Sequence, residues 1–212
     1  MEEKLQKFKE LLKFYNNQFN LTAITSDEEI EIKHFEDSIF GEKWITNGAK
    51  LLDVGSGGGF PSIPLKIVRE DIDMTLLEAT GKKCTYLEIV AKELELKNLK
   101  VVNGRAEEMA FSSMRESYDF VTARAVARLN VLVEYCLPFV KLGGKMIAYK
   151  GDIKEVEEAK NAIKVLGGEI EEVVEYNLSK DMGKRCLVII KKVSLTDKKY
   201  PRSNGKIKKK AL

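Results

Sequence analysis

The 212-residue chain has few of the residues that build metal and nucleophile sites. It contains one histidine, His34, and three widely separated cysteines, Cys84, Cys136 and Cys186, without zinc-ligand or disulfide spacing. We therefore expect small buried thiols, no bound metal and no Ser-His or Cys-His pair. No apolar run approaches a membrane span, and residues 1–7 resemble neither a secretory leader nor a transit peptide. These absences predict a cytoplasmic protein without membrane contact.

The charges are unevenly distributed along the chain. Residues 191–212 contain nine Lys or Arg and one Asp, a net +8, so the chain's net +3 leaves −5 for the other residues. A basic end on an acidic body favours a polyanionic partner such as RNA, and a solvated, partly disordered tail is the compatible alternative. The consecutive Lys208, Lys209 and Lys210 predict a mobile cloud of charge. Arg202 follows the rigid Pro201, so we expect an aimed phosphate contact there.

Glycines dominate the segment that follows a short apolar run at residues 49–54. The order is strand, glycine turn and helix, with the pattern acidic-x-Gly-x-Gly-x-Gly, which is the context of a nucleotide-type site. The dinucleotide fingerprint would place a third glycine where Phe60 stands. The pattern is instead similar to the S-adenosylmethionine loop of class I methyltransferases. Its candidate donor-binding residues are Asp53, Gly55, Ser56, Gly57 and Phe60.

A second acid ends the next apolar run, at residues 74–78. A carboxylate at the tip of the second strand can accept both ribose hydroxyls of an adenosine, so we assign that role to Glu78 over a solvated strand end. NAD sites use the same device, so Glu78 indicates ribose and not a particular cofactor. Arg105, Ala106 and Glu107 follow the third predicted strand, where the chain would read the adenine amine; a helix N-cap is the alternative for Glu107.

The hydrophobic pattern predicts an α/β fold. A helix at residues 2–15 ends at Asn16-Asn17, and a capping box at residues 26–29 starts a second helix that runs toward Phe40. From residue 49 strands and helices alternate, which predicts a parallel sheet with helices on both faces. A turn falls at residues 142–144, and a hairpin loop at 177–184 joins the last two strands. We expect strands near 50–54, 73–77, 99–102, 118–123, 145–150, 170–176 and 185–192, and helices near 62–69, 81–95, 128–140 and 152–166.

Ordered motifs spread over nearly the whole chain match one family. The matching residues are Asn20 to Ile24, His34 with Asp37-Ser38, Leu52 to Gly57, Gly59 to Pro61, Leu77-Glu78, Lys82-Lys83, Gly104 to Glu108, Asp119, Thr122 to Ala127, Gly143-Gly144, Lys150-Gly151, Lys199 to Arg202 and Gly205. On these residues the chain resembles the bacterial RsmG (GidB) family, which methylates guanine N7 in small-subunit ribosomal RNA. Departures are Phe19 for a usual Trp, Ser62 for a frequent Gly, and Ile207 and Ala211 for frequent prolines.

The resemblance implies a class I methyltransferase: a Rossmann-like, seven-stranded, mostly parallel sheet with a terminal antiparallel hairpin. It divides the chain into N-terminal helices (1–45), a methyltransferase domain (46–193) and a basic tail (194–212), in one structural unit. The donor would be S-adenosylmethionine, without a metal. The substrate would be 16S rRNA, as naked RNA, an assembly intermediate or the small ribosomal subunit, and we expect a monomer.

Guanine N7 is a lone pair without a proton, so its methylation requires no general base. Thr122-Ala123-Arg124-Ala125 stands where enzymes that methylate exocyclic amines place a Pro-Pro-aromatic element. We therefore expect Arg124 to position the methionine carboxylate or a nucleotide phosphate, rather than to form an ordinary surface ion pair. His34 is expected to be structural, paired with Asp37 one turn later.

Three further cations, Lys150, Arg185 and Arg202, are candidates for phosphate contact beside the lysine triplet 208–210. Two other functions remain open at this point. A non-catalytic RNA-binding Rossmann module would keep the basic end without an intact donor pocket. A small-molecule methyltransferase would act without RNA and tolerate loss of residues 195–212.

Overall fold

Seven strands form one sheet in the computed structural model, which describes residues 1–212. They lie in the order β3-β2-β1-β4-β5-β7-β6, and all neighbours are parallel except β7, which is antiparallel to both β5 and β6. The expected mostly parallel sheet with a terminal hairpin is confirmed. The strands are β1 (Lys50–Val54), β2 (Asp73–Glu78), β3 (Leu99–Asn103), β4 (Tyr118–Arg124), β5 (Val140–Lys150), β6 (Gly168–Asn177) and β7 (Lys184–Lys192).

The central strands are apolar on both faces because both faces are covered. In β1, Leu52 and Val54 pack into one core beside Val121, whereas Leu51 packs into the core on the opposite face. Side chains alternate between faces along a strand, so one apolar run supplies both cores. The three cysteines are buried free thiols, as expected.

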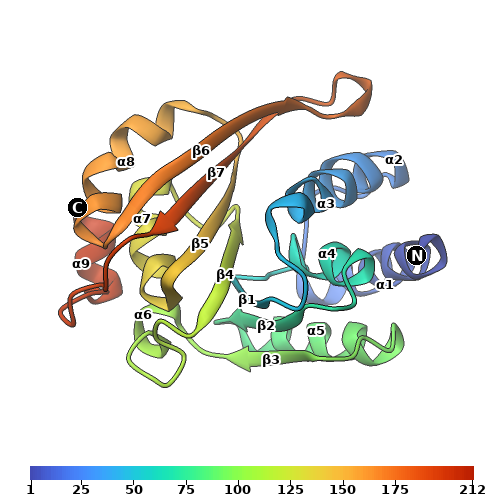
Figure 1. Ribbon diagram of the computed structural model, residues 1–212. Helices are drawn as coiled ribbons and strands as arrows, with labels where there is room; N and C mark the ends of the chain where they lie inside the picture. The colour runs from blue at the N-terminus through green and yellow to red at the C-terminus, as the bar shows by residue number, and fades with distance from the viewer.

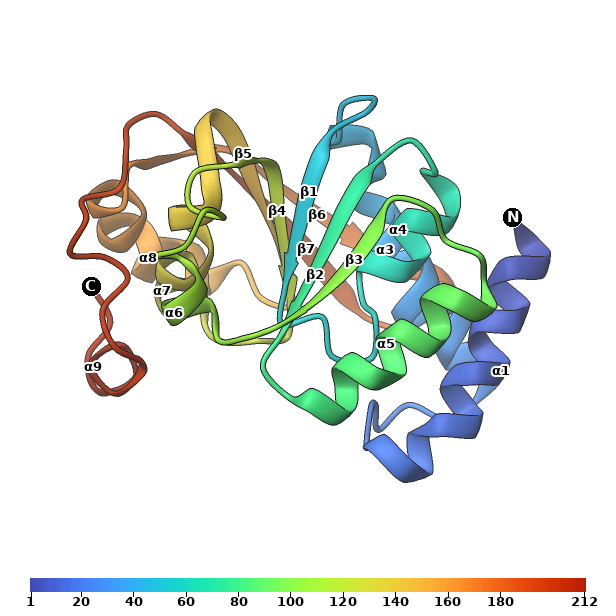
Figure 2. The same cartoon turned by 90° about the horizontal axis from the view of Figure 1, so that it is seen from below.

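Helices enclose the sheet on both sides. Figure 1 shows α1 to α5 on one side and α6 to α9 on the other, and Figure 2 shows the same division from below. In α8, Val156, Ala159, Ala162 and Ile163 recur at helical spacing and are buried. No helix is long and apolar enough to cross a membrane. The helices are α1 (Glu2–Phe19), α2 (Asp27–Glu29), α3 (Asp37–Ile39), α4 (Ser62–Val68), α5 (Gly81–Glu93), α6 (Ala106–Met109), α7 (Leu129–Cys136), α8 (Lys154–Val165) and α9 (Asn204–Lys209).

The first helix is longer than its pattern predicts. The predicted end at Asn16-Asn17 is wrong, and α1 continues to Phe19. The Asn16 side chain serves the loop after the helix: its Oδ1 accepts from the N–H groups of Leu21 and Thr22, and its Nδ2 donates to the Thr22 carbonyl, each at 2.9 Å. The asparagine therefore stays helical because its amide satisfies the following turn.

The predicted capping box starts an irregular helical segment at residues 27–44. The Ser26 hydroxyl accepts from the Glu29 N–H at 3.3 Å and donates to the Glu29 carboxylate at 3.0 Å. The segment begins as α2, widens into a π-helical stretch at Ile30–Glu36, returns to α3 and ends in a 3₁₀ turn at Phe40–Trp44. Such π-helical stretches frequently accompany functional sites, and this one carries His34.

Strand β5 begins at Val140, ahead of its predicted start at residue 145. The turn predicted at residues 142–144 is an irregularity inside this strand, where the pairing with β4 changes register between Tyr118 and Phe120. A Cβ on Gly144 would lie 2.6 Å from the Asp119 carbonyl oxygen, so the strands approach too closely for a side chain. The short helices α6 and α9 carry too few residues for a periodic signal, and the sequence pattern did not predict them.

The C-terminal segment, residues 191–212, is folded against the body, and Lys208 and Lys209 belong to its helix α9. Helix α9 buries Ile207 in the core that contains α7. Arg115 ties the segment down by donating to the carbonyls of Thr196 and Tyr200 at 2.7 and 2.9 Å. Apolar burial and satisfied carbonyls therefore hold the segment, although its composition is basic.

Two of the basic residues in this segment face inward. Lys192 is fully buried, donates to the Leu137 carbonyl at 2.8 Å, and has its pKa lowered to about 8 by burial. Arg202 forms a bidentate pair with Glu134, itself 0% exposed: Nε and Nη2 lie 2.9 and 2.6 Å from Oε1 and Oε2. The prediction that Arg202 contacts a phosphate is wrong. Its guanidinium is held by the buried carboxylate of Glu134, which requires a cation.

Arg202→Ala should lower the free energy of unfolding by about 3–5 kcal/mol, because it leaves the Glu134 carboxylate buried without its partner. Urea unfolding followed by circular dichroism measures the loss. Replacing both residues by leucine should recover most of the stability, since no charge then remains buried. Wild-type stability in Arg202→Ala would show that the pair contributes little.

Candidate active site

The glycine loop leaves the carboxyl end of β1 and turns tightly into α4. Gly55 and Gly57 have φ values of 73° and 54°, which glycine adopts without strain. A Cβ on Gly55 would lie 2.6 Å from Cγ2 of Val126, so that position has no room for a side chain. The loop main chain therefore borders the carboxyl edge of the sheet, where ligands bind in doubly wound folds.

Glu78, at the end of β2, holds this loop. Its Oε2 accepts from the Gly57 N–H at 2.9 Å, and its Oε1 accepts from the Thr80 N–H at 2.8 Å. Each carboxylate oxygen retains a further acceptor position. Glu78 can therefore support the loop and still accept a hydrogen bond from a ligand hydroxyl.

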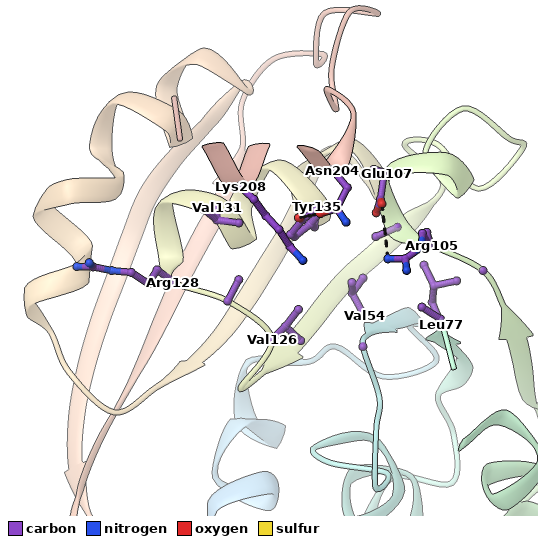
Figure 3. Close-up of a pocket in the computed structure, with 15 residues that line it drawn as sticks. Val54, Leu77, Arg105, Glu107, Val126, Arg128, Val131, Tyr135, Asn204 and Lys208 are labelled. Carbon is purple, nitrogen blue, oxygen red and sulfur yellow. Dashed lines mark hydrogen bonds and ion pairs between the residues drawn. The ribbon is translucent and has the colours of Figure 1, made fainter. Parts of the chain in front are cut away.

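A first cavity of about 380 Å³ lies on one side of Gly55 (Figure 3). The predicted adenine-side residues Arg105, Ala106 and Glu107 all line it. Figure 3 also shows Asn204 and Lys208 reaching toward this cavity from α9. The wall contributed by α9 is fixed by the Tyr135 hydroxyl, which donates to Asn204 Oδ1 at 2.7 Å.

A second cavity of about 450 Å³ lies on the other side of the loop. Gly55, Ala79 and Val126 line both cavities, so the two meet at the Val126 side chain. The remaining wall of the second cavity combines the glycine loop with Glu78 and with polar residues from the N-terminal region and β4. They include Ser56, Gly57, Phe60, Glu78, Thr22, His34 and Arg124, and Lys83 lines the same cavity.

Arg124, at the end of β4, organises the far wall of the second cavity. Its Nη1 pairs with Asp37 Oδ2 at 2.8 Å, its Nη2 donates to His34 Nδ1 at 3.0 Å, and its Cζ lies 5.0 Å from the Phe60 ring centroid. Asp37 also accepts from the Tyr176 hydroxyl at 2.6 Å. The predicted pair of His34 with Asp37 is wrong, because both side chains turn to the guanidinium of Arg124.

The pKa of His34 is lowered to about 3, mainly by burial and then by the charge of Arg124. Its imidazole is therefore neutral near pH 7. Both ring nitrogens have partners, since Nε2 lies 2.9 Å from Thr22 Oγ1. The ring also stacks on Phe60, with centroids 4.1 Å apart. Such an imidazole has no free position from which to take a substrate proton.

Asp53 lies away from both cavities, contrary to the expected donor contact. Its fully buried Oδ1 accepts from the Thr122 hydroxyl at 2.8 Å, and its carbonyl accepts from the Ser56 hydroxyl at 3.1 Å. Burial raises the pKa of this carboxyl. Its Oδ2 and the hydroxyl of Ser62 are buried without partners. Asp53 therefore supports the loop from within the sheet.

The cations predicted to contact phosphate occupy different environments. Lys150 is almost buried and pairs with Glu155 at 2.7 Å, so its charge is already compensated. Arg185 is partly exposed and lines a third cavity of about 280 Å³ that also borders Arg124. Lys208, Lys209 and Lys210 are all exposed, but of the three only Lys208 lines the first cavity.

Several cavity residues escaped the sequence reasoning. Thr22 and Val126 stand inside segments that carry the family resemblance, but no local pattern gave them a role. Tyr135 and Asn204 are far apart in the sequence and meet only because α9 packs on α7. Only the tertiary structure brings this last pair to the first cavity.

Comparison with known proteins decides the family. The family described as rRNA small subunit methyltransferase G matches residues 1–184. The chain belongs to this family. Two relatives called ribosomal RNA small subunit methyltransferase G, from Caldanaerobacter subterraneus subsp. tengcongensis and Acetivibrio thermocellus, are each 47% identical to it. The two matches extend over 99% and 100% of this chain, respectively, and over 90% of each relative.

Solved structures agree with this membership at the level of the fold. A SAM-dependent methyltransferase from Aquifex aeolicus is 18% identical, with a TM-score of 0.60, covering 89% of this chain and 98% of its own. A SAM-dependent O-methyltransferase from Thermotoga maritima is 15% identical, with a TM-score of 0.59, covering 88% of this chain and 72% of its own. The protein is an S-adenosylmethionine-dependent methyltransferase of the rRNA small subunit methyltransferase G family. The glycine loop, the free acceptor positions of Glu78 and the paired cavities fit this donor.

Glu78→Ala should weaken S-adenosylhomocysteine binding by about 1–3 kcal/mol, because the loop and a ligand hydroxyl both lose their acceptor. Isothermal titration calorimetry measures the change, and thermal unfolding checks that the loop region still folds. Glu88→Ala, on the same side of the sheet but outside the cavities, is the matched control. Unchanged affinity in Glu78→Ala would remove this carboxylate from the donor site.

Proposed function

We propose that the enzyme transfers the methyl group of S-adenosylmethionine to N7 of a guanine in 16S ribosomal RNA. One observation carries the choice of acceptor: His34, the histidine on the wall beside the donor loop, is neutral with both nitrogens bonded and is not available as a general base. N7 has a lone pair and no proton, so alignment alone suffices. The printed names of the relatives support ribosomal RNA as the substrate.

The two cavities divide the donor between them in this proposal. The adenine end occupies the first cavity, where Arg105, Ala106 and Glu107 face it. The ribose lies where the two cavities meet, so that Glu78, which lines the second cavity, accepts from its hydroxyls. The methionine half crosses Gly55 to Gly57 into the second cavity. When bound, the donor supplies an electrophilic methyl group. The chain's own residues bind it, orient it and keep water from it.

Arg124 acts in this proposal as a positioning residue. Its guanidinium is fixed by the pair with Asp37, a carboxylate that also lies 3.8 Å from Arg185 Nε. Arg124 orients His34 and covers the face of Phe60, so the wall of the second cavity keeps one shape. Asp53 and Ser56 support the loop in front of that wall.

The RNA surface is proposed to include Arg185 at the third cavity and Lys209 with Lys210 beside α9. Lys150 and Arg202 are removed from it because close pairs with Glu155 and Glu134, at 2.7 and 2.6 Å, hold their charges, whereas Arg185 lies 3.8 Å from its nearest carboxylate, Asp37. Naked RNA, an assembly intermediate and the small subunit are all compatible substrates for a cytoplasmic monomer. A non-catalytic module or a small-molecule methyltransferase is not favoured, given the family and the intact donor loop.

Incubation with labelled S-adenosylmethionine and 16S rRNA, as naked RNA and as small subunits, tests the function. We expect label in one guanine, located by cleavage specific for N7-methylguanine. The single-turnover rate should stay flat from pH 6 to 8, because no residue must lose a proton. Label in a small molecule, or at an exocyclic amine, would overturn the proposal.

We expect Lys208 to contribute to donor binding, and Lys209 and Lys210 to contribute to RNA binding. Neutralising Lys209 and Lys210 should weaken RNA binding, while donor binding stays unchanged. The slope of log affinity against log salt should flatten by about 0.7–0.9 for each phosphate that the protein no longer neutralises. Lys208→Gln should weaken donor binding, because its side chain lines the first cavity. Salt titrations of RNA binding and donor calorimetry on both variants check this. Equal effects of both variants on donor binding would contradict it.

A further inference from the structure

Thr22 is held in a fixed orientation beside the second cavity. The Asn16 amide bonds both its N–H and its carbonyl, each at 2.9 Å. Thr22 lies between two cavities: it lines a small cavity of about 210 Å³ together with Asn16, and the second cavity together with His34. The main chain of Thr22 thus faces the first helix, and its hydroxyl lies on the side of His34 and the second cavity.

The hydrogen-bond network determines which nitrogen of His34 carries the proton. Arg124 can only donate, so His34 Nδ1, 3.0 Å from Arg124 Nη2, must accept. The neutral imidazole then carries its proton on Nε2 and donates to Thr22 Oγ1 at 2.9 Å. The charge of Arg124, balanced by Asp37, therefore sets the direction of the next hydrogen bond along the chain of contacts.

The Thr22 hydroxyl can therefore act toward a ligand only as a hydrogen-bond donor. Its oxygen accepts from His34 Nε2 and from the Ile24 N–H at 3.0 Å, which uses both acceptor positions. The O–H group has no partner within the protein, and the second cavity is the polar space on that side. Thr22 therefore presents a hydroxyl that can donate to a ligand but cannot accept from one.

We propose that Thr22 donates a hydrogen bond to O6 of the target guanine, and that Arg124 and His34 are positioning residues that fix this direction. The inference rests on the proposed function. The edge of guanine that carries N7 also carries O6, and both atoms are acceptors; adenine places an amino donor where guanine has O6. A donor-only hydroxyl binds O6, leaves N7 free for the methyl group, and meets an N–H group if adenine enters. Thr22 thereby selects guanine over adenine.

The test compares Thr22→Val, which keeps the shape, with Thr22→Ser, which keeps the hydroxyl. The RNA is supplied in the form on which the wild type is active. Thr22→Val should lower kcat/KM by about 5- to 30-fold, the effect of removing one hydrogen bond, while Thr22→Ser stays near wild type. S-adenosylhomocysteine affinity should be unchanged in both, because the hydroxyl serves the base and not the donor.

Target-base analogues identify the atom involved. RNA with 2-aminopurine at the target position keeps N7 but lacks O6, and RNA with inosine keeps both atoms and serves as the control. The wild type should disfavour 2-aminopurine relative to inosine, and Thr22→Val should lose most of that preference. Adding His34→Phe to Thr22→Val should cost little more than Thr22→Val alone, because the two residues act in one chain of contacts.

Three outcomes would overturn the inference. One is a Thr22→Val enzyme with wild-type kcat/KM; another is an unchanged preference against 2-aminopurine. The third is a large loss of S-adenosylhomocysteine affinity in Thr22→Val, which would assign the hydroxyl to the methionine carboxylate. A wild-type enzyme that leaves guanine N7 unmethylated would instead overturn the proposed function itself.

Discussion

The ion pair between Arg124 and Asp37 is the contact on which the reaction side of the molecule depends. The two side chains are only 13% and 4% exposed, and a cation so far from water requires a partner. Arg124 comes from the end of β4 and Asp37 from the start of α3, so the pair joins the N-terminal helices to the sheet. Tyr176 of β6 bonds the same carboxylate and brings in the terminal hairpin. The N-terminal helices, β4 and the terminal hairpin therefore meet at the Asp37 carboxylate.

The same pair governs the chemistry of that wall. Its guanidinium and the surrounding burial keep His34 neutral, and the neutral ring can pass on a hydrogen bond with a defined direction. Phe60 of the glycine loop stacks beneath the imidazole, so the donor loop and the wall are in contact. A site whose histidine is not available as a base suits an acceptor that carries a lone pair, because positioning then supplies much of the rate.

The C-terminal segment contributes to the first cavity, which its basic composition does not predict. Its basic residues suggest a tail for a polyanion, yet Ile207, Lys192 and Arg202 are held in the body by packing, burial and an internal carboxylate. Helix α9 then places Asn204 and Lys208 at the first cavity. Residues that would bind RNA on one side of α9 thus adjoin residues that would bind the donor on the other.

The sequence by itself determined the sheet, the glycine loop, the position of Glu78 at the end of the second strand and the family. Strand and helix signals are local and periodic, and the loop and Glu78 lie at strand ends that any parallel sheet brings to one edge. The tertiary structure decided that Asp53 is a support, that Arg202 faces Glu134, and that Arg124, His34 and Thr22 form one chain of contacts. Each of these depends on the burial of a charge beside a residue distant in sequence. No local pattern records which charges become buried, because burial is a property of the packed layers.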